Sequence, residues 1–294
     1  MGQMEQAQHC LGRAIFLKPQ EGHTKYLSLA QLMTGVESRD LYLKAIEIIS
    51  SLLSSLNPEH ETRTELRRDI SNAYVSLSEI YMTDLCDEPE AEIESKRFID
   101  LSVEADETNP ESFQARANYL LITGNSEDAK ISIGKSIQLW LPAHLKFLES
   151  GEGEDTNLSY TFRLSTAKIL LDLEDYDNAT KVLDGLIEED EEVVSTWYLL
   201  GWLNYLRSQS ESDYQGNARY YLRRARDVNT MAPTDDQAMI EHITELLTEL
   251  GEGEEEHDDD GVNIGEAEPD TVAEILDQEA DGYHPPNQEE RMED

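Results

Sequence analysis

The side chains in this sequence best suited to metal or nucleophilic chemistry are seven histidines and two cysteines. The histidines are scattered, and none stands at zinc-ligand spacing from another ligand. Cys10 and Cys86 form no metal or redox spacing, which favours reduced thiols in a cytosolic or nuclear protein. The chain has neither a Gly-x-Ser-x-Gly elbow nor a phosphate-binding loop. We therefore predict no enzyme, no catalytic residues and no cofactor.

The nearest match to a metal site is the stretch EHDDDGVNIGEA, which begins at Glu256. Glu256, Asp258, Asp260 and Gly261 imitate the first half of a calcium-binding loop. The twelfth position of such a loop needs a glutamate that binds through both oxygens, and Ala267 stands there instead. A solvated acidic segment explains this stretch better than a calcium site, so we predict no metal.

Charge is the dominant feature of the composition. The 63 acidic and 23 basic residues give a formal net charge of −40. Such a charge repels phosphate, so we expect no direct nucleic-acid ligand and favour a basic partner, although solubility alone is the commoner reason for an acidic surface. No apolar run approaches the ~20 residues that cross a bilayer, so we expect no membrane association.

The composition changes near Leu250. Residues 251–294 contain eighteen acidic residues and one basic residue, a net charge of −17, which leaves −23 for residues 1–250. Few apolar residues and strong like-charge repulsion are typical of disorder. We predict that 251–294 is an acidic, largely disordered tail.

Residues 1–250 carry a repeated pattern of two helices. Phe113, Ala117 and Leu120 share one face of a first helix, Gly124-Asn125 makes a turn, and Ala129 and Ile133 share a face of a second helix. Small residues where two helices cross, with large residues filling the hollows, are what a packed helical hairpin needs.

The same template fits four other places, with first helices around Tyr26, Tyr74, Ala167 and Trp197. The segment MEQAQHCLGRAIFLKP near the start fits only a second helix, and DDQAMIEHITELLTEL fits a final helix that caps the stack. This is the tetratricopeptide signature, with Trp197-x-x-Leu-Gly as its most recognisable piece. We predict an all-α, right-handed tetratricopeptide superhelix over 1–250. It would comprise five full helix pairs, a leading half repeat and a capping helix.

In such a superhelix the first helix of each pair lines a concave groove. The groove-facing positions follow the large template residue by one, and recur four and seven residues later. These positions are Leu27, Gln31 and Thr34; Val75, Glu79 and Met82; Gln114, Asn118 and Leu121; Leu164, Lys168 and Leu171; and Tyr198, Trp202 and Tyr205. An alternative for any of them is packing against a neighbouring repeat.

Acidic and aromatic groups at or near this groove suit a basic, extended partner. They would attract the cationic ends of its lysine and arginine side chains, and apolar surface would cover the aliphatic stems. In WYLLGWLNYL, residues 197–206, we expect one face in the core, with Gly201 letting Ala218 or Leu222 approach. The other face should be a binding platform that adds little to stability. The predicted partner-binding residues are Glu79, Asp84, Glu111, Asn118, Asp172, Tyr198, Trp202 and Tyr205.

Three segments also resemble one particular family. They are SNAYVSLSEIYMTDLCDEPEAE at 71–92, EADETNPESFQARA at 104–117 and STWYLLGWLNYL at 195–206. They are similar to the fungal tetratricopeptide chaperones dedicated to large-subunit ribosomal protein four, over most of residues 3–250. The resemblance implies a monomeric chaperone that binds the basic internal loop of the newly made ribosomal protein. It also implies protection of that protein from aggregation and degradation, and escort from cytoplasm to nucleus for assembly of the large ribosomal subunit.

Two other functions compete with this one. A general acidic chaperone or adaptor for basic nuclear proteins, such as histones, would use the same surface. A clamp for the acidic C-terminus of heat-shock chaperones needs a set of cations, whereas the groove offers Lys168 and Asn118. The identity of the ligand separates these alternatives.

Overall fold

A computed structural model describes residues 2–151, 158–251 and 253 of the chain. Within these residues the secondary structure is twelve α-helices and no strand. The helices are α1 Gln3–Leu17, α2 Thr24–Ala30, α3 Gly35–Ser55, α4 Thr62–Met82, α5 Ala91–Ala105, α6 Pro110–Ile122, α7 Ser126–Ser150, α8 Tyr160–Asp172, α9 Tyr176–Glu189, α10 Val194–Ser208, α11 Tyr214–Met231 and α12 Gln237–Leu250. The possible calcium loop at 256–267 and nearly all of the predicted tail lie outside the described residues.

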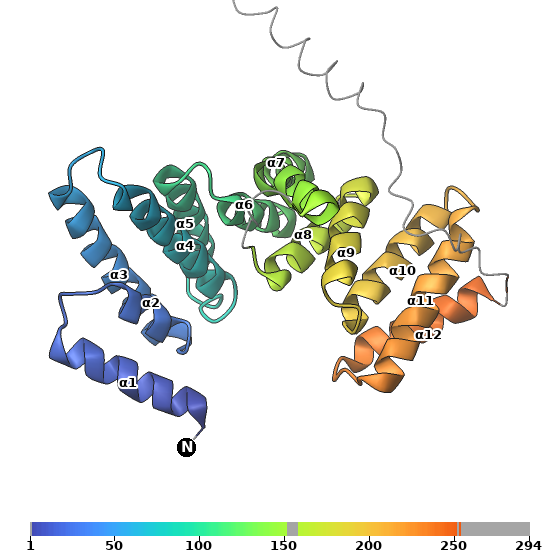
Figure 1. The fold of residues 1–294 in the computed structure, drawn as a ribbon, viewed down its shortest axis with the longest axis horizontal. Helices are drawn as coiled ribbons and strands as arrows, with labels where there is room; N and C mark the ends of the chain where they lie inside the picture. The colour runs from blue at the N-terminus through green and yellow to red at the C-terminus, as the bar shows by residue number, and fades with distance from the viewer. Residues whose placement is uncertain (1, 152–157, 252, 254–294) are drawn as a thin grey trace, which may run out of the picture. The chain divides into compact units, whose positions relative to one another are not determined.

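Helices α2 to α11 form five consecutive pairs, and the two helices of each pair pack against one another (Figure 1). Each pair also contacts the next one along the chain, as α4 contacts α6 and α10 contacts α9. Helix α1 packs on α2, and α12 packs on α10 and α11. The predicted all-helical tetratricopeptide fold is confirmed. The division of the chain at Leu250 stays a prediction.

Local sequence explains where several helices begin. The side chains of Asn109, Asn125, Ser159, Asp175 and Asp236 each accept a hydrogen bond from a backbone N–H in the first turn that follows. These caps satisfy donors that a helix N-terminus otherwise leaves without partners. Each of these five helices therefore begins at a residue whose side chain fixes its first turn.

The core is formed by the small and large template residues. Ala117, Ala129, Ala167 and Ala179 are fully buried, and so is Leu200. Alanine at these crossings lets the helices of a pair approach, and leucine, isoleucine and tryptophan fill the space on either side. This packing fixes which face of each first helix is left outside the core.

A buried arginine joins the middle repeats. Arg163 on α8 donates to His144 Nε2 on α7 at 3.1 Å and forms an ion pair with Glu189 on α9. Only 4% of Arg163 is exposed, so these contacts stabilise a cation that would otherwise be costly to bury. The arginine thereby holds α8 against both neighbouring second helices.

Candidate partner-binding surface

We call the eight predicted partner-binding residues the candidate surface. They lie on the first helices α4, α6, α8 and α10, apart from Asp84, which follows the end of α4. The structure divides them into an acidic group near α4 and α6, an isolated Asp172, and an aromatic group on α10.

The acidic group is centred on Glu79 and Glu111. Helices α4 and α6 pack together, and the charge of Glu111 acts on Glu79. Burial raises the pKa of Glu79, and the nearby Glu111 carboxylate raises it further. Burial also raises the pKa of Glu111, although Arg68 opposes this. Glu79 is nonetheless open to solvent. We call the region around these two carboxylates, at the contact of α4 with α6, the acidic recess; a cation placed there would stabilise both charges.

Arg68 does not neutralise this recess on its own. Its Nε donates to Asp106 Oδ2 at 2.5 Å, and its Nη2 donates to the Thr108 carbonyl at 3.0 Å. The guanidinium group is thus held by the loop between α5 and α6. The two like-charged glutamates therefore have beside them one arginine that is already engaged by this loop.

Asp84 has a structural role, the capping of another helix, that the repeat pattern does not predict. Its Oδ2 accepts a hydrogen bond from the backbone N–H of Gly35 at 2.7 Å, in the first turn of α3. Thr34, which stands at the cap position, makes no such bond itself. Asp84 therefore caps a helix of the preceding repeat. Its side chain is exposed, so a partner can still reach it.

The other two polar residues stand apart. Asn118 is half-buried in the middle of α6, and Asp172 is exposed at the last residue of α8. Burial raises the pKa of Asp172. No contact among the described residues links either of them to the Glu79–Glu111 pair, and their roles, like those of the other six residues, remain predictions.

The aromatic group on α10 is half-buried rather than open. Tyr198 stacks on Trp202 with ring centroids 6.1 Å apart, and the edge of His242 from α12 meets both rings at 5.8 Å. Tyr198 Oη also lies 2.7 Å from His242 Nδ1. Tyr205 Oη donates to Glu249 of α12 at 2.5 Å. The predicted platform is therefore shared between α10 and α12, and these contacts argue against the expectation that it adds little to stability.

Two further positions assigned to the groove belong to the core. Val75 packs with Ile99 and Ala115, and Leu171 is buried in the largest core cluster. Both are apolar residues for which packing against a neighbouring repeat was the open alternative. The spacing that assigns residues to the groove is therefore more reliable for charged residues than for apolar ones.

One acidic site was missed. Asp184 on α9 is half-buried, and its pKa is raised to about 6 by burial and then by the charge of Glu188. Burial, and then the charge of Asp184, raise the pKa of the half-buried Tyr221 to about 12. Only the four-residue spacing of Asp184 and Glu188 on one helix hinted at this repulsion.

The described residues hold neither a cluster of metal ligands nor a membrane-spanning helix. There, no three His, Cys, Asp or Glu side chains gather as metal ligands would. No helix in that part of the chain is long and apolar enough to cross a membrane.

Comparisons with known proteins agree with this architecture. No family model matches the chain. A protein of Schizosaccharomyces pombe named "probable assembly chaperone of rpl4" is 30% identical over 251 residues, which is 81% of this chain and 71% of that protein. A protein of the same name from Emericella nidulans is 24% identical over 217 residues, 66% of this chain and 54% of its own length.

Among solved structures, the assembly chaperone of RpL4 (Acl4, residues 1–338) superimposes with a TM-score of 0.63. The match covers 72% of this chain and 80% of that one, at 23% identity. At that identity the structural match supports the fold alone.

Proposed function

The chain belongs to the family of fungal proteins named probable assembly chaperones of rpl4, and on this premise we propose that it is a dedicated chaperone for that ribosomal protein. The 30% identity across most of both chains carries the proposal. The acidic recess at Glu79 and Glu111 supports it, because a basic client is the partner that such a recess favours.

We further propose that the client is bound through its basic internal loop, lying along the candidate surface. Lysine and arginine heads would pair with Glu79 and Glu111, while the stems and backbone of the loop would lie against Tyr198 and Trp202. Binding a basic loop neutralises its charge and covers it, which would protect the new protein from aggregation and degradation. Escort between cytoplasm and nucleus and delivery to the large-subunit precursor follow from the same proposal, with the chaperone acting as a monomer.

Affinity capture tests the identity of the client. A tagged chain is expressed in fungal cells, and its bound proteins are quantified by mass spectrometry. One ribosomal protein should dominate the bound fraction. Recovery of many basic proteins in proportion to their abundance, histones included, would favour the general acidic adaptor instead.

A pair of double variants tests the location. Glu79→Gln with Glu111→Gln should weaken binding of the isolated basic loop about tenfold or more in calorimetry, because it removes two recessed charges. Glu59→Gln with Glu107→Gln removes the same charge from exposed loops and should cost less than threefold. Equal losses in the two variants would mean that net charge, and not this recess, attracts the loop.

A further inference from the structure

Helix α11 carries the opposite charge to the rest of the molecule. Four arginines, at positions 219, 223, 224 and 226, fall within eight residues, and Asp227 is the one acidic residue of the helix. The helix thus has a net charge of +3 in a chain of net charge −40. Like charges so close together repel one another, so packing of the fold alone does not favour this arrangement.

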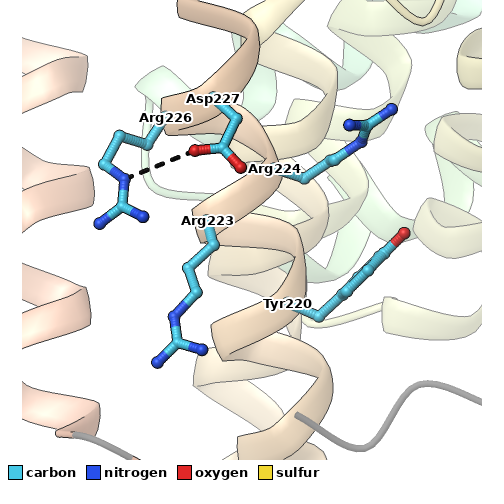
Figure 2. Close-up of a pocket in the computed structure, with 5 residues that line it drawn as sticks. All are labelled: Tyr220, Arg223, Arg224, Arg226 and Asp227. Atoms are coloured by element: carbon cyan, nitrogen blue, oxygen red, sulfur yellow. Dashed lines mark ion pairs between the residues drawn. The ribbon is translucent and has the colours of Figure 1, made fainter. Parts of the chain in front are cut away.

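Helix α11 has one side in the core and another that faces solvent. Ala218, Leu222 and Ala225 are fully buried on the side that meets α10 and α12. Four residues on the solvent side (Tyr220, Arg223, Arg224 and Arg226) line a shallow hollow of about 360 Å³ together with Asp227. We call these five residues the arginine patch. Figure 2 shows Arg223 and Arg226 projecting along one edge of it, Tyr220 and Arg224 along the other, and Asp227 between them.

Two arginines of the patch, Arg224 and Arg226, have only loosely compensated positive charge. Arg226 Nε is 3.8 Å from Asp227 Oδ1, and Arg224 Nη2 is 3.9 Å from Glu191 Oε2, both too long for a hydrogen bond. Arg224 and Arg226 are both exposed. Arg224 is also held over the ring of Trp197, with Cζ 5.4 Å from the centroid. An arginine side chain that is already ordered by an aromatic ring loses less conformational entropy when it binds a carboxylate.

The patch is separate from the candidate surface. It lies on a second helix, whereas the candidate surface lies on the first helices and just beyond α4. A basic client gains nothing at the arginine patch, since the charges would repel. The client therefore does not explain the patch.

We propose that the arginine patch is a docking surface for a short acidic segment, rich in Asp and Glu, of a partner protein. Charge complementarity and the planar geometry of guanidinium groups favour carboxylates. A nucleic acid is the weaker fit, because its long run of phosphates would extend over a domain whose net charge is −23 over residues 1–250. A short peptide places its charge on the patch alone. The chaperone would then hold a basic client on one surface and an acidic partner on another.

The test is a fluorescence-anisotropy titration of the full chain with a labelled decapeptide of alternating Asp and Glu. The main variant is Arg224→Gln with Arg226→Gln, and the matched control is Lys130→Gln with Lys181→Gln, which removes two exposed cations from α7 and α9. The wild type and the control should bind within twofold of each other, and the main variant at least tenfold more weakly. Arg224→Lys with Arg226→Lys keeps the charge and should recover most of the affinity, with circular dichroism confirming that all variants fold.

Three results would overturn the proposal. One is the absence of saturable peptide binding by the wild type. Another is an equal loss in the control variant, which would show an effect of net charge only. The third is a ten-nucleotide RNA that binds at least as tightly as the peptide and loses affinity in the same variant, which would make the patch a nucleic-acid site. Binding of the basic client loop should be unchanged in the main variant, so this test and that of the proposed function fail independently.

Discussion

At the scale of single residues, Asp184 shows how a carboxylate inside the repeat links stability to pH. Its folded-state pKa of about 6 lies above its ordinary value of 3.8, because burial and Glu188 disfavour the charged form. A raised carboxylate pKa means that ionisation costs stability above the folded pKa. That cost should decline as the pH falls through about 6, and should vanish below 3.8, where both states are protonated.

Replacement of Asp184 by Asn should therefore stabilise the protein at pH 7.5, by on the order of 2 kcal/mol, and the gain should shrink steadily towards pH 4. Denaturant titrations at several pH values measure it. Asp87→Asn changes an exposed loop carboxylate and should have little effect throughout. A gain that is as large at pH 4 as at pH 7.5 would show that the carboxylate charge is not the cause.

At position 201, Leu222 leaves no room for a side chain larger than that of glycine. A Cβ placed there would lie 2.6 Å from Leu222 Cγ and 3.0 Å from the Leu222 backbone nitrogen. Leu222 is fully buried and cannot easily retreat. Gly201→Ala should therefore cost about 1–3 kcal/mol by overpacking, even though alanine is the better helix former.

Gly134 provides the matched comparison for this substitution. It also lies within a helix, α7, but a Cβ there meets no atom within 4 Å. Gly134→Ala should gain up to about 1 kcal/mol from helix propensity. Thermal melts of the two variants should shift in opposite directions. A Gly201→Ala variant that melts as high as the wild type would disprove the tight crossing of α10 and α11.

At the scale of elements, the two tryptophans of α10 separate the core of the last pair from its contact with α12. Trp197 is buried, and its Nε1 donates to the Glu191 carbonyl at 2.8 Å. Trp202 is half-buried between Tyr198 and His242. Trp197→Ala should cost ~3–5 kcal/mol as a large-to-small change in a core. Trp202→Ala should cost less, about 2 kcal/mol, because it removes one ring from the packing of α10 with α12.

Hydrogen exchange can assign that second loss to α12. In Trp202→Ala, amide protection should fall mainly in α12 and little in α2 to α7, none of which has α10 or α12 among its main packing partners. A Trp202→Ala variant with unchanged melting temperature and unchanged exchange in α12 would restore the original prediction of a binding platform that adds little to stability.

The same elements show what sequence can and cannot predict here. Helix pairs could be predicted because alanine and leucine recur at fixed spacing, and each crossing depends on residues near one another in the chain. The contact of Tyr198 with His242, and of Asp84 with Gly35, joins residues more than forty positions apart, and no local pattern specifies it. Val75 and Leu171 were misplaced for a related reason, because an apolar side chain beside a groove is equally suited to the next repeat.

At the scale of the whole molecule, charge is arranged at two levels, and these should act on different steps of client binding. The net charge of −23 over residues 1–250 acts at long range and should accelerate the approach of a basic loop. The recessed Glu79–Glu111 pair acts only after contact, where the surrounding protein strengthens its interaction with a cation.

Stopped-flow measurements with the isolated basic loop can resolve the two levels. The association rate should fall steeply as salt rises from about 20 to 500 mM, since screening shortens to ~8 Å near physiological ionic strength. Glu59→Gln with Glu107→Gln removes exposed charge and should slow association slightly, leaving dissociation unchanged. Glu79→Gln with Glu111→Gln should instead accelerate dissociation, because the bound loop loses two partners in the recess. If that second variant changes association alone, the two glutamates contribute only to the general field of the molecule, and the loop is held elsewhere.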